Sequence, residues 1–549
     1  MGLDCILVGY HEPHQRADEL DAVADLDEGP PPISNLLRTR LRVDGHSLAY
    51  LDAVSYLRRG DEYGNYGVYN VAELPNLGAI YLANFLRRRG HHAEVVNSFT
   101  YERSRLAELL EEGPASVAVT TTFYMSPAPV VEIVRTIREH RPEIPVIVGG
   151  PLVDNCCRDM SPDQLGRVFD RMGADVYVRD SQGEATLAAL IDGLCSRRTL
   201  GGIPNTFTHD GTGWRFTTRR PENNDIDAGA VSWSDFDCAD IGPTVSTRTA
   251  RSCAFKCAFC DYPARAGALA LADLDTVARE LEELAEMGVQ RVAFIDDTFN
   301  VPVRRFQALC RMMVERQFGI EWFSYFRCGN ARDSAIYDLM YEAGCRGVLL
   351  GIESGDDAVL KAMDKRATTS DYRFGIEQLE QRDIFVHASL VVGFPGETAA
   401  SVQRTIEFIN QTHPDTFAVN HWYYVSSTPI QSRADTVGLS GSGYQWSHAT
   451  MSSGEAVAQA NRVFFEVTEA AWMPVNGLDF WGVPYLLGKG LEPSGVVELL
   501  ERAKPLTLAS RLCTGSPQAQ ERHERAFADL CATLPLEPAR YQVTYSEHR

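Results

Sequence analysis

The first third of the chain alternates short apolar runs with longer amphipathic segments. Residues 73–90 show helical spacing, carry basic residues in the last turn and end at a glycine, which predicts a helix. The short apolar runs predict buried strands. Strands that alternate with helices at this pitch favour a Rossmann-like, doubly wound parallel sheet in an α/β protein. The predicted strands are residues 4–9, 93–96, 116–121, 145–148 and 175–178.

From Thr244 the same alternation returns at the pitch of a βα barrel. Six apolar runs predict a partial (β/α)6 barrel, and the region that follows reads as mainly helical, with helices at 454–470 and 493–503. We therefore expect three domains. They are residues 1–215, 216–428 and 429–549. The predicted barrel strands are residues 244–248, 291–300, 321–326, 347–355, 384–392 and 416–424.

Composition narrows the class of protein. The 549 residues are 44% hydrophobic, which is enough for several cores, and the net charge of −22 argues against partners such as nucleic acid or an anionic membrane. No stretch approaches the roughly 18 apolar residues of a membrane span, and the N-terminus lacks the pattern of a signal peptide. The thirteen cysteines favour reduced thiols over a disulfide framework. We expect a cytoplasmic protein.

Three cysteines stand close together directly after the first predicted barrel strand. Cys253, Cys257 and Cys260 are separated by three and then two residues. Tetrahedral zinc usually takes four ligands in two separated pairs. Three close cysteines with no obvious fourth instead suit a cubane iron–sulfur cluster that leaves one iron open to a ligand. A zinc site and a chance spacing are the alternatives.

Polar groups also follow the other predicted barrel strands. In a βα barrel the carboxyl ends of the strands carry the chemistry. Those ends hold Asp296 with Asp297, Arg327, Glu353 with Ser354, and the loop 393–397. Each group alone could cap a helix, but their coincidence with the cysteines favours a binding site.

Three loops beyond the strands of the N-terminal sheet are rich in hydroxyl groups and glycines. They are residues 120–126, 149–151 and 179–184. Hydroxyl groups donate hydrogen bonds, and glycine lets the backbone approach closely, as a large polar cofactor requires. Helix capping is the alternative for any one of these loops.

The CxxxCxxC spacing, with Phe259 before the last cysteine, resembles the signature of radical S-adenosylmethionine (SAM) enzymes. Segments 294–299, 351–355 and 392–398 resemble the SAM-binding strands of that family. The resemblance implies a [4Fe-4S] cluster on the three cysteines, which are its metal ligands and catalytic residues. It also implies SAM contacts. These are Asp296 and Asp297 at the amine, Arg327, Glu353 and Ser354 at the carboxylate and ribose, and Phe259, Gly393 and Pro395 beside the adenine. An arginine that the family often has after the cluster loop is missing from residues 268–272.

Leu74-Pro-Asn-Leu-Gly78, with the later Gly-Gly and Gly-Glu pairs, is similar to the cobalamin-binding domain fused to many radical SAM enzymes. The nearest match to the cobalt-ligating Asp-x-His-x-x-Gly motif is Asp44-Gly-His46, which lacks the glycine. The resemblance therefore implies cobalamin bound without a histidine ligand. The implied cobalamin contacts are Asn76, Gly78, Thr121, Thr122, Tyr124, Ser126, Gly149, Gly150, Pro151, Gly183 and Glu184.

Segments 296–302, 420–430 and 444–451 closely resemble the PhpK-type cobalamin-dependent radical SAM enzymes, which include a phosphinate P-methyltransferase. The resemblance implies a class B radical SAM methyltransferase of natural-product biosynthesis. A radical made from SAM would take hydrogen from a small-molecule or peptide-linked substrate, which then collects methyl from methylcobalamin at an unactivated phosphinate phosphorus or carbon. An electron donor such as flavodoxin or ferredoxin is implied. The predicted substrate contacts are His421, Trp422, Tyr423, Trp446 and His448.

Two other interpretations stay open. A radical SAM enzyme of similar architecture could catalyse cyclisation, rearrangement or epimerisation without methylation. A binding protein that carries a cluster or zinc is the non-enzymatic alternative. The sequence leaves the oligomeric state and the identity of the substrate open.

Overall fold

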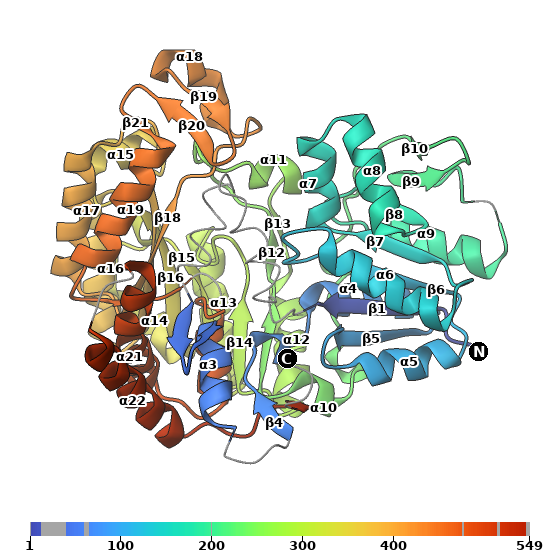
Figure 1. Cartoon of the computed structure of the whole chain (residues 1–549), viewed down its shortest axis with the longest axis horizontal. Coiled ribbons are helices and arrows are strands. Elements are labelled where there is room, and N and C mark those ends of the chain that lie inside the picture. Colours follow the sequence, from blue (N-terminus) through green and yellow to red (C-terminus); the bar gives the residue numbers. More distant parts are fainter. Residues whose placement is uncertain are drawn as a thin grey trace. The chain divides into compact units, whose positions relative to one another are not determined.

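The computed structural model describes residues 2–11, 40–59, 65–198, 200–474, 477–512 and 516–544. The chain divides into two compact units, which are described separately below (Figure 1). The first unit comprises Met1–Arg16 and Ala72–Asp240, and the second comprises Ala17–Val71 and Ile241–Arg549. The three-domain division of the sequence stays a prediction.

The first unit is built on a seven-stranded sheet in the order β10-β9-β8-β7-β6-β1-β5. Its five strands β5, β1, β6, β7 and β8 are parallel, and β9 and β10 extend the sheet antiparallel. The parallel part has the strand order 2-1-3-4-5, which confirms the predicted doubly wound sheet. The strands are β1 (Cys5–Tyr10), β5 (Ala93–Ser98), β6 (Ser116–Thr120), β7 (Val146–Gly149), β8 (Val176–Val178), β9 (Thr206–His209) and β10 (Trp214–Phe216).

Two apolar cores cover the two faces of this sheet. Alternate residues of β1 serve opposite faces, because successive side chains of a strand point to opposite sides. Ile6 and Val8 enter one core, and Cys5 and Leu7 enter the other. The first core includes residues of α5 (Arg103–Glu111), α6 (Ala128–His140), α7 (Pro151–Asp159) and α8 (Pro162–Met172), and the second includes residues of α4 (Leu77–Arg87) and α9 (Glu184–Cys195).

The second unit contains a seven-stranded parallel sheet in the order β11-β14-β15-β16-β17-β18-β22. The sheet is open, so the predicted partial barrel is confirmed, and the six predicted strands are all present. The strands are β11 (Thr244–Thr247), β14 (Arg291–Phe294), β15 (Glu321–Phe326), β16 (Cys345–Glu353), β17 (Phe385–Val392), β18 (Thr416–His421) and β22 (Ala471–Trp472). The connecting helices are α12 (Leu274–Glu286), α13 (Val303–Arg316), α14 (Ser334–Glu342), α15 (Asp357–Ala362), α16 (Thr369–Glu380) and α17 (Ala399–Thr412).

The rest of the second unit is largely helical, as predicted for the C-terminal region, and its described residues add four small sheets. The helices are α3 (Tyr50–Leu57), α11 (Tyr262–Ala266), α18 (Ala434–Val437), α19 (Ser453–Glu466), α20 (Gly482–Gly488), α21 (Pro493–Leu512) and α22 (Pro517–Thr533). The short strands are β2 (Leu41–Val43), β3 (His46–Leu48), β4 (Asn65–Val68), β12 (Ala250–Arg251), β13 (Ala270–Leu271), β19 (Ser440–Ser442), β20 (Gln445–His448), β21 (Met451–Ser452) and β23 (Tyr541–Thr544). None of the helices among the described residues has the length and apolar content needed to cross a membrane.

The Asp44-Gly-His46 segment has a structural explanation. Asp44 and Gly45 have φ angles of 49° and 80° and form the turn of the β2–β3 hairpin. Asp-Gly is a favoured pair for such two-residue turns, because both positions require a positive φ. The turn therefore accounts for the Asp-Gly pair without a cobalt-ligating role.

Asn97 at the end of β5 holds the segment that leads into α4. Its side-chain oxygen accepts from the Asn76 amide at 2.6 Å, and its amide group donates to the carbonyls of Ala72 and Leu74 at 2.8 and 3.1 Å. Replacement by alanine leaves buried polar groups unpaired, at a cost of about 1–3 kcal/mol. We expect Asn97→Ala to speed amide hydrogen exchange in residues 72–80 by about tenfold or more.

The control for this prediction is Asn97→Asp, which keeps the acceptor oxygen and loses both donated hydrogen bonds. Its exchange rates should fall between those of wild type and Asn97→Ala, and peptides of the second unit should be unaffected. Unchanged exchange in residues 72–80 of the alanine variant would contradict this role of Asn97.

Candidate active site

The cysteine loop follows β11 and reaches the ends of the neighbouring strands. Cys253 Sγ lies 3.6 Å from the hydroxyl of Thr298, after β14. Cys257 Sγ lies 3.9 Å from Nη1 of Arg327, after β15. The backbone of Ala258 bonds to Met363 and Ile430 at 2.8 and 2.9 Å. The loop is therefore fixed from both sides, at the end of the sheet where βα folds carry their chemistry.

The spacing of the three thiols suits a cluster better than a single ion. Among the residues that the structure describes, one group of three ligand atoms lies within 4.8 Å of one another, and it does not contain these cysteines. Burial raises the pKa of Cys260 to about 11, and the nearby Cys257 and Cys253 add to this effect. A cluster whose irons each take one thiolate spaces the sulfurs more widely than one ion does. The donor set therefore fits the predicted [4Fe-4S] cluster.

Arg327 presents unused donors beside Cys257. The side chain is buried, and its guanidinium lies 3.7 Å from the centroid of the Phe255 ring. Its Nε and Nη2 atoms are buried without a hydrogen-bond partner. Because buried donors without partners are costly, this arrangement fits a bound anion such as a carboxylate.

Asp296 and Asp297, both predicted to contact the SAM amine, occupy different environments. The buried Asp296 carboxylate accepts from the amides of Thr249 and Ala250 at 2.7 and 3.0 Å and from the Thr249 hydroxyl at 2.6 Å. Arg305 of α13 donates to the same threonine at 3.1 Å. Asp296 thus fixes the start of the cysteine loop.

Asp297 keeps an accessible carboxylate. The protein atoms that flank it remove water, and the negative charge of Asp296 adds to this effect, so the pKa of Asp297 rises from 3.8 to about 7. A cation placed against this carboxylate would favour its ionised form. Of the two aspartates, Asp297 is therefore the one suited to bind an ammonium group.

Glu353 forms a buried ion pair that the sequence pattern did not indicate. Its carboxylate lies 2.7 Å from Nζ of Lys365, and that nitrogen lies 5.7 Å from the centroid of Phe259. Glu353 has a φ of 66°, an uncommon conformation for a residue with a side chain, and such residues cluster at functional sites. Ser354 is buried and accepts from the Asp356 amide at 3.2 Å, so its hydroxyl shapes the turn into α15.

The loop at Gly393 and Pro395 is held by buried groups. The Gly393 amide donates to the Glu397 carboxylate, and the Gly393 carbonyl lies 2.9 Å from Nε2 of His448. Gly393 has a φ of 103°, and a Cβ there would lie 2.6 Å from the Trp446 ring. The close approach of Trp446 therefore requires glycine at this position.

The five predicted substrate residues divide into two groups. Trp422, Trp446 and His448 are buried, Trp446 Nε1 donates to the Trp422 carbonyl at 2.9 Å, and the Trp446 and His448 rings stack at 5.1 Å. These three side chains support the Gly393 loop. His421 and Tyr423 instead flank Tyr444, with centroids 4.4 and 4.6 Å from its ring.

Tyr444 was missed as a candidate, although it lies in a segment of mixed aromatic and polar residues. Tyr423 is 43% exposed, and burial lowers the pKa of His421 to about 4, so the imidazole is neutral at pH 7. The group formed by His421, Tyr423 and Tyr444 follows β18 and presents neutral rings.

In the first unit, the predicted cobalamin residues lie at the carboxyl edge of the sheet. The strand order switches between β1 and β6, and ligands of doubly wound sheets bind at such a switch point. A Cβ at Gly78 would lie 3.2 Å from the hydroxyls of both Thr120 and Thr122. Asn76 caps α4 by accepting from the Ala79 amide at 3.0 Å, and its Nδ2 is buried without a partner. These groups form a close polar surface at the switch point.

The loop after β6 combines internal hydrogen bonds with exposed apolar side chains. Thr121 donates to the Gly149 carbonyl at 2.8 Å, and Tyr124 donates to the Gly9 carbonyl at 2.8 Å. Phe123 and Met125 are 72% and 81% exposed. Ser126 is also exposed. The predicted polar residues Thr121 and Tyr124 therefore hold the loop, while Phe123 and Met125 offer an apolar surface that the sequence analysis did not select.

The remaining predicted cobalamin residues begin helices. Gly150 has a φ of 105° and precedes Pro151, the first residue of α7, and Gly183 has a φ of 80° before α9. Glu184 accepts from Asn224 at 2.8 Å. The backbone of these turns is placed at the same sheet edge as Thr121, but the Glu184 carboxylate already has a partner within the unit.

His11 at the end of β1 is a further residue that the sequence analysis missed. Its Nε2 lies 3.0 Å from Glu132, and its Nδ1 is buried without a partner. The hydrogen bond from His11 lowers the pKa of Glu132 to about 2, with Arg103 contributing. No sequence pattern marks this pair, because 120 residues separate its members.

The cysteine loop and the strands β14 to β17 lie within a segment that matches a protein family. Residues 247–409 match the Radical SAM superfamily. The chain is 27% identical over 355 residues to the uncharacterized methyltransferase PH0819 of Pyrococcus horikoshii, covering 62% of this chain and 74% of that protein. It is 25% identical over 368 residues to the anaerobic magnesium-protoporphyrin IX monomethyl ester cyclase of Cereibacter sphaeroides, covering 62% of this chain and 57% of the cyclase.

The chain also shares the fold of solved cobalamin-dependent enzymes. The radical SAM methyltransferase TsrM of Kitasatospora setae, solved with cobalamin and a [4Fe-4S] cluster, aligns with a TM-score of 0.58 at 19% identity over 80% of this chain and 97% of TsrM. OxsB, solved with aqua-cobalamin and SAM, aligns with a TM-score of 0.59 at 12% identity over 84% of this chain and 83% of OxsB. The arrangement of a doubly wound unit followed by a radical SAM domain is thus shared with both.

Glu397 makes the stability of the second unit depend on pH. Burial raises its pKa from 4.5 to about 8, so between these values the folded state holds a proton that the unfolded state has released. The stability of wild type relative to Glu397→Gln should therefore fall by about 1.4 kcal/mol for each pH unit across this range. Thermal unfolding of both proteins from pH 5 to 8 should show a growing difference in Tm that favours the glutamine variant.

The matched control is Glu455→Gln, because the Glu455 side chain is exposed and its pKa is lowered instead of raised. This variant should show no such gain on raising the pH. A constant difference in Tm between wild type and Glu397→Gln would contradict the protonation of Glu397 in the folded state.

Proposed function

We propose that this chain is a cobalamin-dependent radical SAM methyltransferase. The observation that carries the proposal is the cysteine loop. It holds Cys253, Cys257 and Cys260 at the end of the sheet, and its Cys257 lies beside the buried, partly unpaired Arg327. The matches to PH0819 and to sll1242 of Synechocystis, both named as uncharacterized methyltransferases, support the transfer of a methyl group. The chain aligns with 46% of the length of sll1242.

Different residues of the second unit bind different parts of SAM. The three cysteines hold the cluster, Arg327 binds the SAM carboxylate through its unused donors, and Asp297 binds the ammonium group. Phe259 and the Gly393 loop lie beside the adenine, and Glu353, oriented by Lys365, binds the ribose. The bound cluster supplies one electron for cleavage of SAM. The protein fixes SAM and excludes competing reactions.

The first unit holds cobalamin at the switch point between β1 and β6. Asn76, Gly78 and Thr122 supply close polar contacts, and Phe123 and Met125 supply an apolar surface to a large ring. Cobalamin supplies the methyl group when it is bound there. The hairpin role of Asp44 and Gly45 supports binding without a lower histidine ligand from that motif.

The methyl acceptor is an unactivated phosphinate phosphorus or carbon of a small or peptide-linked natural-product precursor. The likeness of segments 296–302, 420–430 and 444–451 to the PhpK-type enzymes supports this choice. His421, Tyr423 and Tyr444 present neutral rings, which suit an uncharged or planar portion of the substrate. TsrM has been solved with tryptophan as its substrate, with a TM-score of 0.54 at 17% identity over 84% of this chain and 97% of TsrM.

A flavodoxin or ferredoxin supplies electrons to the cluster.

One observation favours a second function, which is radical cyclisation without methyl transfer. The cyclase of Cereibacter sphaeroides matches this chain over about as many residues as PH0819 does. The mass of the product separates the two reactions, because methylation adds a methyl group and consumes about two SAM molecules for each turnover.

Removal of one cluster ligand should abolish the function of the cluster and leave the binding of cobalamin intact. Cys257→Ala should abolish both 5′-deoxyadenosine formation and methyl transfer, because the cluster loses one of its three cysteine ligands. The same variant should leave cobalamin binding unchanged. The measurements are chromatography of the SAM products and the cobalamin absorption of the purified protein. Cys310→Ala, which removes a buried cysteine of α13, is the control and should keep both activities. Continued deoxyadenosine formation by Cys257→Ala would contradict the assigned cluster ligands.

Substitution of Asp297 and substitution of Asp296 should impair different properties of the protein. Asp297→Asn should weaken SAM binding by about 10- to 100-fold with the iron content unchanged, because a charged contact is lost. Asp296→Asn should instead lower the iron content after reconstitution, because one amide oxygen cannot replace a carboxylate that accepts three hydrogen bonds. Calorimetry with SAM and iron analysis measure the two effects.

Asp275→Asn on the exposed side of α12 is the matched control and should change neither quantity. Wild-type SAM affinity in Asp297→Asn, or wild-type iron content in Asp296→Asn, would contradict the division of roles between these residues.

A further inference from the structure

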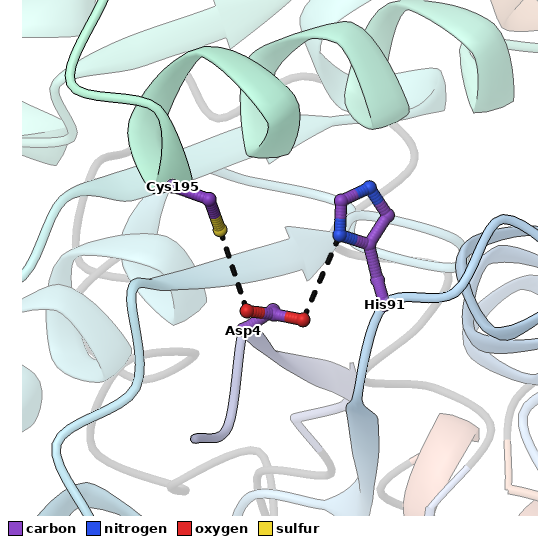
Figure 2. Close-up of side chains that lie close together, drawn as sticks. All are labelled: Asp4, His91 and Cys195. Atoms are coloured by element: carbon purple, nitrogen blue, oxygen red, sulfur yellow. Dashed lines mark hydrogen bonds and ion pairs between the residues drawn. The ribbon is translucent and has the colours of Figure 1, made fainter. Parts of the chain in front are cut away.

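Three metal-ligating side chains meet at the amino edge of the first unit's sheet (Figure 2). Asp4 directly precedes β1, His91 precedes β5, and Cys195 ends α9. One ligand atom from each lies within 4.8 Å of the other two. Cys195 Sγ is 3.3 Å from Asp4 Oδ1, and His91 Nδ1 is 3.6 Å from Asp4 Oδ2. Because β1 and β5 are parallel, this group lies at the opposite edge of the sheet from the loops proposed to hold cobalamin.

Neighbouring groups orient the histidine and the aspartate as ligands. His91 Nε2 lies 3.1 Å from Oδ1 of Asp192, and the His92 amide donates to Asp4 Oδ2 at 2.8 Å. A metal-binding histidine commonly donates its other ring N–H to a carboxylate, which fixes the tautomer. The contact of Nε2 with Asp192 leaves Nδ1 as the ring atom that faces Asp4. A divalent cation placed between Nδ1 and the Asp4 carboxylate would be attracted by both.

The charge of the group also favours a cation. Among the described residues, neither Asp4 nor Asp192 forms an ion pair with a lysine or arginine, and both face His91. A divalent ion bound to one thiolate, one carboxylate and one imidazole leaves its immediate ligand set neutral. The His91 side chain is 11% exposed and that of Asp4 is 26% exposed, whereas Cys195 is exposed, so an ion can reach the group from solvent.

We propose that Asp4, His91 and Cys195 form a zinc site, with water completing a tetrahedral shell. A thiolate and an imidazole select zinc over magnesium or calcium, which prefer ligand sets made of oxygen. The ion joins the start of β1, the turn before β5 and the end of α9, which are far apart in the sequence. This site is independent of the cluster cysteines and of the proposed methyl transfer.

The test uses the full-length protein with its cluster reconstituted under anaerobic conditions. The protein is treated with Zn²⁺ alone, freed of excess ion by gel filtration, and analysed for zinc and iron by mass spectrometry. Wild type should retain about one zinc per chain. Cys195→Ser and His91→Gln should lose it with the iron content unchanged. Cys238→Ser, which removes another exposed cysteine of the same unit, is the matched control and should keep the zinc.

Two further measurements report on the ligands themselves. Co²⁺ in place of Zn²⁺ should give a thiolate-to-cobalt absorption band in wild type that is missing from Cys195→Ser. Asp192→Asn should lower zinc affinity by about 10- to 100-fold in competition with a chelator, since it removes the group that orients His91. Because Cys195 and the Asp192 side chain are exposed, these variants test the site even if His91→Gln fails to fold. Equal zinc content in wild type and Cys195→Ser, or no thiolate band with Co²⁺, would overturn the proposal.

Discussion

The carboxylate of Asp296 is the interaction on which the cysteine loop depends. It is buried at the end of β14 and accepts three hydrogen bonds from Thr249 and Ala250, immediately before the first cysteine of the loop. Arg305 binds the same threonine from α13, so the strand, the helix and the loop are joined at one point. The first residues of a loop that holds a cluster must be rigid. A buried carboxylate with its hydrogen bonds satisfied makes them so.

Many side chains around the proposed SAM site hold its binding groups in position and do not themselves contact a ligand. Trp446, His448 and Glu397 fix the Gly393 loop through buried contacts, and Lys365 orients Glu353. The groups that remain for a ligand are the accessible carboxylate of Asp297, the Nε and Nη2 atoms of Arg327, and the rings of His421, Tyr423 and Tyr444. Binding groups held by packed neighbours in this way keep their geometry when a ligand enters.

The strands could be predicted from the sequence because parallel strands buried on both faces read as continuous apolar runs. The strand β22 was missed because two residues are too few to make a pattern, and the helices α7 and α8 were also missed. Which residues follow each strand could also be read from the chain. The difference between Asp296 and Asp297 could not, because it depends on which side chain reaches Thr249 across the sheet. The same holds for Trp446 and His448, since burial against Gly393 is a property of tertiary packing.

The central claim is that three cysteines hold a cluster whose fourth iron binds SAM. Electron paramagnetic resonance of the reduced, reconstituted protein tests it most directly. We predict a [4Fe-4S]⁺ signal that shifts when SAM is added, because a ligand at the open iron would change the electronic environment of the cluster. A signal that SAM leaves unchanged, or the lack of any cluster signal in fully reconstituted protein, would contradict the claim.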